Sequence, residues 1–341
     1  MDAVLLVSFG GPESTTEVMP FLRRVTAGRN VPEERLELVA EHYYARGGVS
    51  PINGQNRSLQ EALQRVLADD GLTVFWGNRN SSPWLTDAFE EMEEAGVTLA
   101  IAVFTSAFSS YSGCRQYREN LADSIGTARM EVRKIPAYYN TPGFVRANLD
   151  HLTNALSQAA PESRVLFTTH SIPVGMAESS GPGGGQYVAQ HMALAAHLMS
   201  EVAALTGREY PWELVYQSRS GPPHVPWLEP DINDRLRELA GSGVDEVVVA
   251  PIGFVSDHME VVQDLDAEAA RTAAELGLQY RRVPTVGDHP VFVQGLADSV
   301  RAVRDGRRVA TDFKDALPSP CPAGCCPNPR GDRPALCEVG A

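Results

Sequence analysis

The sequence predicts an α/β protein that contains two doubly wound domains with parallel sheets. Short runs rich in Val, Ile, Leu and Phe have the near-continuous hydrophobicity of parallel strands that are covered on both faces. Longer amphipathic stretches alternate with these runs, as helices do when they connect parallel strands. The chain has 341 residues, which is enough to bury the cores of two ordinary domains. We therefore expect one domain at residues 1–140, a second at 141–310 with a hinge near 136–142, and a Cys-rich tail at 311–341.

The expected elements follow from hydrophobic periodicity along the chain. Ser14-Thr15-Thr16-Glu17 has the pattern of a capping box that opens the first helix. Pro20 fits poorly inside a helix, so we expect this helix to begin later than the box indicates. Further helices are predicted at stretches that include 85–95, 186–204, 232–240 and 261–274. Strands are predicted at residues 3–9, 72–76, 98–104, 165–168, 214–217 and 246–252.

The composition argues against several classes of partner. A formal net charge of −14 disfavours nucleic acid, because phosphate binding needs clustered Lys and Arg. No apolar run approaches the roughly 20 residues that a membrane-spanning helix needs. The first residues have no basic segment ahead of their apolar run, so we interpret them as a first strand and not as a signal peptide. We expect a cytoplasmic protein that acts as a monomer.

The five cysteines are unevenly distributed. Cys114 stands alone in the first half of the chain, whereas Cys321, Cys325, Cys326 and Cys337 lie in the tail. An odd number of cysteines in a protein expected in the cytoplasm disfavours a disulfide framework. Metal ligation or redox chemistry fits this distribution better, and something must tie down a tail that is too rich in Pro and Gly to pack a core alone.

Polar residues that directly follow predicted strands are the first candidates for a site, because ligands of open parallel sheets bind at the carboxyl ends of the strands. His170 lies in Thr169-His170-Ser171-Ile172-Pro173, just after the strand at 165–168. An imidazole there titrates near neutrality and suits proton transfer. A histidine that only forms hydrogen bonds at the start of a loop is the alternative interpretation.

The segment after the last predicted strand places Asp257, His258 and Glu260 close together, with Asp264 one helical turn beyond Glu260. One interpretation is structural, with Ser256 or Asp257 capping a helix. Capping does not require the histidine as well, so a cation or proton-transfer site is the other interpretation.

A third segment, 217–223, is followed by Pro226-Trp227-Leu228. An aromatic residue on a Pro-rich loop suits the wall of a flat apolar ligand, although a structural turn fits equally well. Gly181-Pro182-Gly183-Gly184-Gly185 lacks the Lys-Ser/Thr of a phosphate-binding loop, so we reject nucleotide binding.

Taken together and in order, these segments resemble the ferrochelatase family. The matching blocks run from about residue 4 to residue 266, which is most of the chain. Each block is moderately specific, but the ordered set is strong. The blocks are Leu6-Val7-Ser8-Phe9-Gly10-Gly11-Pro12-Glu13, Pro20-Phe21-Leu22-Arg23, Gly47-Gly48-Val49-Ser50-Pro51-Ile52, Thr169-His170-Ser171-Ile172-Pro173, Gln217-Ser218-Arg219 with Pro226-Trp227-Leu228, and Ser256-Asp257-His258-Met259-Glu260.

The resemblance implies two Rossmann-like domains of the chelatase type, with a porphyrin in the cleft between them and ferrous iron as the second substrate. It assigns catalysis and contact with Fe2+ to His170 and Glu260, with Asp257 and His258 in support. Metalation must remove pyrrole protons and strip water from Fe2+, which an imidazole and a carboxylate can share. We interpret His170 as the base and Glu260 as its partner. Some relatives have Tyr in place of Phe9, and because Phe9 cannot bind iron, approach of the metal from that side is not expected.

The cysteines resemble those of ferrochelatases that hold a [2Fe-2S] cluster with one internal cysteine and three near the C-terminus. Cys114 resembles the internal ligand, and we favour Cys321, Cys325 and Cys326 for the other places, with Cys337 as a substitute. Thiolate ligation suits iron–sulfur chemistry and would anchor the tail. Zinc held by four thiolates is the competing interpretation.

Coproporphyrin III is the favoured porphyrin. Relatives that use apolar protoporphyrin often have a hydrophobic lip, whereas the corresponding stretch here, 31–38, is short and acidic. The resemblance suggests porphyrin contacts, some of them to carboxylates, although whether Arg23 or Arg24 takes part is open. These candidate porphyrin-binding residues are Phe9, Arg23, Arg46, Ser50, Tyr117 and Trp227.

Four other functions stay open at this point. The chain could be a protoporphyrin IX ferrochelatase, a cobalt or nickel chelatase of tetrapyrrole synthesis, or a porphyrin carrier without catalysis, since a fold does not dictate an activity. A redox sensor that uses only the tail cysteines is also possible, but it leaves the segments after the strands unexplained.

Overall fold

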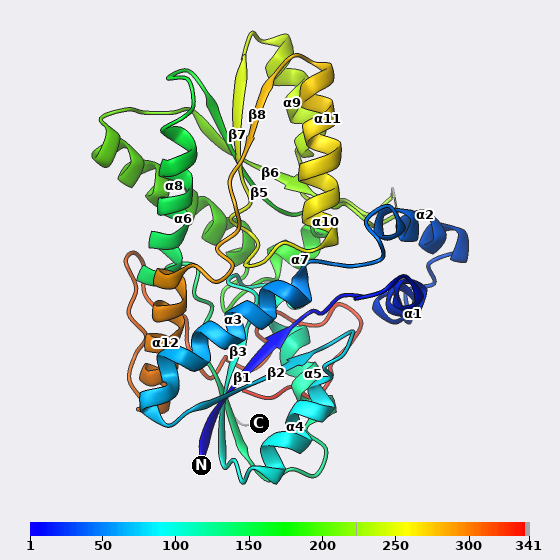
Figure 1. The fold of residues 1–341 in the computed structure, drawn as a ribbon, viewed down its shortest axis with the longest axis vertical. Coiled ribbons are helices and arrows are strands. Elements are labelled where there is room, and N and C mark those ends of the chain that lie inside the picture. The colour runs from blue at the N-terminus through cyan, green and yellow to red at the C-terminus, as the bar shows by residue number, and fades with distance from the viewer. Residues whose placement is uncertain (223, 338–341) are drawn as a thin grey trace.

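Two parallel four-stranded sheets form the framework of the protein (Figure 1). The computed structural model describes residues 1–222 and 224–337. The sheet orders are β2-β1-β3-β4 and β6-β5-β7-β8, so the two halves share one topology and the predicted α/β class is confirmed. The strands are β1 (Asp2–Ser8), β2 (Thr73–Asn78), β3 (Leu99–Phe104), β4 (Glu131–Lys134), β5 (Arg164–His170), β6 (Trp212–Gln217), β7 (Glu246–Ala250) and β8 (Gln279–Arg282).

All six predicted strands are present, and two further strands, β4 and β8, are not in the predicted set. β4 has the sequence Glu-Val-Arg-Lys and β8 has the sequence Gln-Tyr-Arg-Arg, so neither contains an apolar run. Each lies at the edge of its sheet, where charged side chains are common because they discourage pairing with another chain. Hydrophobicity therefore reveals the central strands and not these edges.

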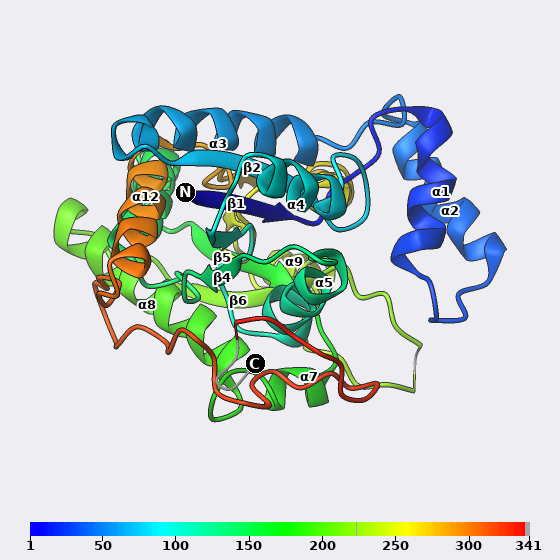
Figure 2. The ribbon, with the colours of Figure 1, turned by 90° about the horizontal axis from the view of Figure 1, so that it is seen from below.

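Helices cover both faces of each sheet, as a doubly wound fold requires (Figures 1 and 2). Among the described residues, no helix combines the length and hydropathy needed to cross a membrane. The helices are α1 (Thr15–Val25), α2 (Glu33–Tyr44), α3 (Ile52–Leu67), α4 (Leu85–Glu94), α5 (Gln116–Ser124), α6 (Pro142–Leu156), α7 (Val174–Glu178), α8 (Gln186–Thr206), α9 (Ile232–Gly241), α10 (Met259–Val261), α11 (Ala270–Glu275) and α12 (Pro290–Arg304), with the 3-10 turn η1 (Ala68–Asp70) and the π-helical segments η2 (Tyr111–Arg115) and η3 (Val262–Ala269).

The first helix begins at Thr15, so the expected later start is wrong. Pro20 lies inside α1 but is exposed, so its ring meets no packed neighbour. Ser14 precedes the helix without capping it, because its hydroxyl contacts Thr16 Oγ1 at 3.0 Å. Glu17 accepts a hydrogen bond from the backbone of Glu13 and not from that of Ser14, so the predicted capping box does not form.

One continuous hydrophobic core joins the two sheets. It includes Val4 and Leu6 of β1, Phe167 of β5 and Val248 of β7, all of which are fully buried. Helix α12 follows the second sheet in sequence but packs against α3 and β3 of the first half as well as against α6 (Figure 1). A division of the chain near residue 140 stays a prediction, and α12 is the element that crosses it.

Helices α1 and α2 form a hairpin that lies to one side of the sheets (Figure 2). Val18, Phe21 and Tyr43 of this hairpin pack together with Met259 from the second half. The hairpin is therefore fixed to the loop that follows β7.

His191 of α8 joins the two halves inside the core. Its ring stacks on Phe108, which follows β3, with ring centroids 3.6 Å apart. Its Nδ1 donates a hydrogen bond to the backbone oxygen of Tyr187 at 2.7 Å, which leaves the buried Nε2 without a partner among the described residues. Burial lowers the pKa of His191 to about 3.

We expect the His191→Gln variant to lose part of the dependence of stability on pH. The pKa of His191 is depressed on folding, so the unfolded chain gains a proton near its ordinary value of 6.5 that the folded chain refuses until about pH 3. The contribution of His191 to the free energy of unfolding is complete above about pH 6.5. It is lost as the pH falls, with a slope of up to about 1.4 kcal/mol per pH unit for one proton. Urea unfolding of both proteins between about pH 4 and pH 8 measures the difference, and identical slopes would contradict the assignment.

A close contact between α6 and α12 gives a second prediction. A Cβ added to Gly295 would lie 2.6 Å from the Cα of Gly143, so Gly295→Ala should force the helices apart. We expect a loss of about 1–3 kcal/mol in the free energy of unfolding, measured with denaturant. Gly54→Ala in α3 is the matched control, because no atom lies within 4 Å of the added Cβ and Ala is the better helix former.

Candidate active site

His170 is the last residue of β5, and its side chain is 30% exposed. Its Nδ1 lies in hydrogen-bond contact with the backbone oxygen of Ser171. A carbonyl oxygen can only accept, so Nδ1 carries the proton and Nε2 presents a lone pair when the ring is neutral. This Nε2 lies 3.6 Å from Glu260 Oε2. Two acceptors that face each other at this distance can share a proton or a cation.

Glu260 lies in the short helix α10, just after β7, and its side chain is 51% exposed. His258 Nδ1 is 3.8 Å from the same Oε2, so the carboxylate is flanked by two imidazoles. The pKa of His258 is lowered by burial and by the nearby His170, while Glu260 acts in the opposite direction. His258 is the residue before the helix, and no side chain caps it, so capping by Ser256 or Asp257 is not observed.

Asp257 is turned toward structural partners. It forms an ion pair with Arg282 of β8. Its backbone N–H donates to Gln55 Oε1 of α3 at 2.8 Å, and Gln55 Nε2 donates to its carboxylate at 3.4 Å. Asp257 thus links the loop after β7 to the first half of the chain and holds the neighbouring His258 and Glu260 in place.

The third predicted segment meets the second at Asp264. This residue lies in η3, and Gln217 Nε2 donates to it at 3.4 Å while the hydroxyl of Ser218 forms a shorter hydrogen bond. Burial, together with the charge of Glu260, raises the pKa of Asp264 to about 7, although the hydrogen bond from Ser218 acts in the opposite direction. The carboxyl ends of β5, β6 and β7 therefore converge on one group of titratable side chains.

Trp227 is fixed to the loop that carries His170. Its backbone pairs with Pro173, and its ring covers Gly221, where an added Cβ would lie 2.3 Å from the indole. Pro223 of the same predicted segment lies outside the described residues.

Two of the predicted porphyrin-binding residues, Phe9 and Tyr117, lie close to Arg79. The guanidinium is 5.6 Å from the centre of the Phe9 ring and 4.4 Å from that of Tyr117. Arg79 also donates to Asn120 Oδ1 at 2.6 Å. Sequence reasoning missed Arg79, although its position directly after β2 is the signal that drew attention to His170.

The remaining predicted porphyrin-binding residues occupy different settings. Arg23 forms an ion pair with Glu33 on the surface, whereas its neighbour Arg24 donates to the backbone oxygen of Asn80 at 2.7 Å. Ser50 is buried, and Arg46 is exposed.

The cysteines form a separate buried group. Cys114, Cys321, Cys325 and Cys326 pack together, with Cys325 Sγ and Cys326 Sγ 3.9 Å apart. The backbone N–H of Gly181 donates to Cys326 Sγ at 3.0 Å. In residues 1–222 and 224–337, no three His, Cys, Asp or Glu side chains are arranged to hold one metal ion.

The four thiols differ in their pKa: mutual hydrogen bonding among the cysteines lowers it for Cys321 and Cys326 and raises it for Cys114 and Cys325. Hydrogen bonds from Cys114 and Cys325 hold the pKa of Cys321 below its ordinary value. Lys134 is buried nearby, and its pKa is raised by Cys114 and Cys321 in spite of burial. Arg118 is also buried and donates to the backbone oxygen of Cys325 at 3.2 Å.

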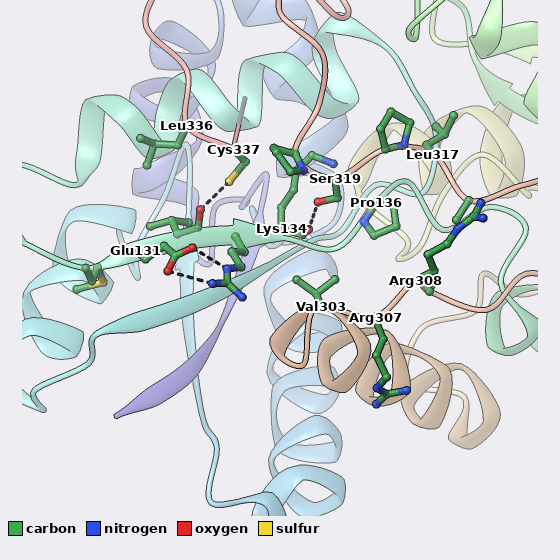
Figure 3. A pocket seen from close by; sticks show the side chains of 18 of the residues that line it. Glu131, Lys134, Pro136, Val303, Arg307, Arg308, Leu317, Ser319, Leu336 and Cys337 are labelled. Carbon is green, nitrogen blue, oxygen red and sulfur yellow. Dashed lines mark hydrogen bonds and ion pairs between the residues drawn. The ribbon is translucent and has the colours of Figure 1, made fainter. Parts of the chain in front are cut away.

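Cys337 is set apart from these four thiols. Its Sγ donates to the backbone oxygen of Val132 at 3.3 Å, and Ser319 Oγ donates to that of Lys134 at 2.6 Å (Figure 3). The tail therefore covers the outer edge of β4. The pocket of about 850 Å³ drawn there is lined mainly by this edge, the end of α12 with the residues after it, and the tail. Of the predicted site residues only Cys337 lines it.

Comparison with known proteins identifies the chain. Residues 1–303 match the family model described as Ferrochelatase. The coproporphyrin III ferrochelatase of Streptomyces griseus is 51% identical, over 98% of this chain and 95% of the relative. That of Frankia alni is also 51% identical, over 97% of this chain and 87% of the relative.

Solved structures support the chelatase type of fold. SirB from Bacillus subtilis with Fe3+ superposes with a TM-score of 0.53 at 12% identity, over 91% of this chain and 99% of that one. CbiX, described as the terminal enzyme of siroheme biosynthesis in denitrifying bacteria, gives 0.50 at 14% identity, over 88% and 98%. At such identities the likeness concerns the fold alone. The family match and the close relatives together show that the chain belongs to the ferrochelatase family.

Proposed function

We propose that this protein is a lyase that inserts ferrous iron into coproporphyrin III in haem biosynthesis. The observation that carries the proposal is the facing pair of His170 Nε2 and Glu260 Oε2, 3.6 Å apart, at the carboxyl ends of β5 and β7. The pair occurs in a chain that is about half identical to coproporphyrin III ferrochelatases over nearly its whole length.

The pair supplies the proton chemistry that metalation needs. Two pyrrole protons leave the macrocycle as one Fe2+ enters, so the site must accept protons near neutral pH. His170 accepts the first at Nε2, because Ser171 holds the other ring nitrogen as a donor. Glu260 stabilises the resulting imidazolium and meets the incoming cation as a carboxylate ligand. Asp264, with its pKa raised to about 7, is suited to take up the second pyrrole proton.

Iron reaches the macrocycle from the side of His170 and Glu260 in this proposal. Phe9 has no donor atom and packs edge-on against Phe21, with ring centroids 6.1 Å apart. Phe9 therefore contributes an apolar surface for the porphyrin and no ligand for the metal.

The choice of porphyrin follows from charge. Coproporphyrin III has four carboxylates, and arginines from separate segments, including Arg24 and Arg79, line one pocket with Phe9. Carboxylates are bound well by guanidinium groups, which offer paired donors. A protoporphyrin ferrochelatase, a cobalt or nickel chelatase and a carrier without catalysis are the alternatives that the first experiment below tests.

We also propose that Cys114, Cys321, Cys325 and Cys326 hold a [2Fe-2S] cluster. Four buried thiols that pack together suit a site in which two irons each take two thiolates. Lys134 and Arg118 offset the negative charge that thiolates would bring. When bound, such a cluster supplies a redox-active centre, while the role of these residues is to fix the tail to the first half of the chain. Cys337 is then the spare cysteine.

The cellular setting is a further proposal. We infer that the protein works in the cytoplasm as a monomer, with domains at residues 1–140 and 141–310 and the Cys-rich tail after them. Haem synthesis from soluble, polar porphyrins needs no membrane surface, which supports this location.

Replacement of His170 or Glu260 tests the proposed enzyme. We expect His170→Gln and Glu260→Gln to reduce kcat for iron insertion by about 10²–10⁴-fold, because each removes a proton-transfer group from the reacting centre. Binding of metal-free coproporphyrin III, measured by fluorescence, should change far less. Glu275→Gln, at an exposed position of α11, is the matched control.

Anaerobic incubation of the wild-type protein with Fe2+ and either porphyrin decides among the alternatives. Absorbance of the metalated product should appear with coproporphyrin III and more slowly with protoporphyrin IX, and competition with Co2+ or Ni2+ should not favour those metals. Product from neither porphyrin would refute the enzyme. Unchanged porphyrin delivery by the His170 and Glu260 variants, without metalation by the wild type, would indicate a carrier.

Iron and sulfide analysis tests the cluster. Protein purified without oxygen should absorb visible light and contain iron and acid-labile sulfide in equal amounts. We expect Cys326→Ser to lose both, and Cys337→Ser to keep them because that thiol lies against Val132. A folded wild-type protein that is colourless and free of iron rules the cluster out.

A further inference from the structure

A pocket of about 430 Å³ beside Phe9 gathers positive charge in a chain whose net charge is −14. It is enclosed by the end of α1 and the loop after it, the segment after β2, helix α5 and the C-terminal tail. Its charged lining residues are Arg24, Arg29, Arg79, Arg330, Arg333 and Asp332. Five guanidinium groups against one carboxylate mark a site for an anion.

Two of these arginines have neutral partners. Arg79 donates to Asn120 Oδ1, and Arg24 donates to the backbone oxygen of Asn80 and lies 4.6 Å from the centre of the Trp84 ring. These contacts orient the guanidinium groups without cancelling their charge.

Arg29 and Arg330 have no carboxylate within ion-pair distance in residues 1–222 and 224–337, whereas Arg333 is paired with Asp123 at 2.7 Å. Burial and the charge of Arg330 both lower the pKa of Arg29, so the two cations lie close enough to repel each other. Like charges held together in this way are stabilised when an anion binds between them.

The pocket adjoins the proposed porphyrin surface, because Phe9 is one of its lining residues. Glu260 raises the pKa of Arg29, although burial dominates and lowers it. Arg79 lies against both Phe9 and Tyr117, which the proposed function places on the porphyrin. The anion that fits is therefore a carboxylate at the rim of the same macrocycle.

We propose that Arg330, supplied by the Cys-rich tail, binds a carboxylate of the porphyrin substrate together with Arg29 and Arg79. The inference rests on the proposed function and adds the tail to the substrate-binding surface. Arg330 is exposed and lines the pocket, so its long side chain is within reach of a carboxylate bound there.

The position of Arg330 depends on the contacts that hold the tail to one helical unit. Asn328 Nδ2 donates to Glu119 Oε2 of α5 at 3.1 Å, and Arg115 donates to the backbone oxygen of Arg333 at 3.0 Å. The continuous helix η2–α5 also carries Cys114 and Tyr117. The four-thiol group and the carboxylate site therefore both include residues of the same short helix. Both also need the tail to be held in place against it.

Equilibrium binding of metal-free coproporphyrin III, followed by porphyrin fluorescence, tests the proposal. We expect Arg330→Gln to raise Kd roughly tenfold, because one charge-assisted hydrogen bond is lost, and Arg330→Lys to raise it less. The tetramethyl ester of the same porphyrin has no carboxylates, so Arg330→Gln should leave its Kd unchanged. Arg308→Gln is the matched control, because that arginine, just before the tail, is 78% exposed and pairs with Asp315 outside this pocket.

The outcomes separate this inference from the proposed function. If the wild type binds and metalates coproporphyrin III but Arg330→Gln binds it equally well, the tail inference is overturned and the enzyme stands. If the wild type does neither, the proposed function itself fails. Inorganic phosphate that competes with the ester as strongly as with coproporphyrin III would show that the pocket holds a free anion, and would also overturn the inference.

A double variant tests the link through the tail. Cys326→Ser releases the tail from the four-thiol group, so it should weaken binding of coproporphyrin III about as much as Arg330→Gln does. Adding Arg330→Gln to Cys326→Ser should then have little further effect. Fully additive effects would show that Arg330 is placed independently of the cysteines, and circular dichroism confirms that each variant folds.

Discussion

The position of β5 between β6 and β7 is the constraint on which the site depends. All three strands are parallel, so their carboxyl ends meet at one edge of the sheet. His170 ends β5, Gln217 ends β6, and the loop after β7 carries Glu260. Residues that lie far apart in the sequence are thus brought to one edge of the sheet, where hydrogen bonds from Gln217 and Ser218 to Asp264 join the segments.

The rigidity of this edge comes from contacts with the first half of the chain. Gln55 of α3 forms two hydrogen bonds with Asp257, and Met259 is buried among side chains of α1 and α2. Both anchored residues are neighbours of the proposed catalytic carboxylate in the sequence. The half that holds the proposed porphyrin contacts therefore also fixes the position of Glu260, which couples substrate binding to the geometry of proton transfer.

Sequence reasoning finds the central strands and the proposed catalytic pair. It misses β4, β8 and most of the arginines that line the pocket beside Phe9. β1 and β7 are buried on both faces, so their apolar runs are visible, whereas β4 and β8 are short edge strands with charged residues. His170 is found because it directly follows an apolar run. Arg330 lies in a segment without periodicity, and its place beside Phe9 depends on long-range contacts that no local pattern encodes.

The distribution of charge explains why local arginines matter in an acidic protein. A porphyrin with four carboxylates is repelled at long range by a chain of net charge −14, so its binding depends on attraction at short range. At physiological salt the Debye length is about 8 Å, which screens distant acidic groups more than guanidinium groups in direct contact. The five arginines of the pocket can therefore attract a carboxylate at short range more strongly than the distant acidic groups repel it. Because two of these arginines belong to the tail, a substrate-binding surface of this kind is complete only when the tail is in place.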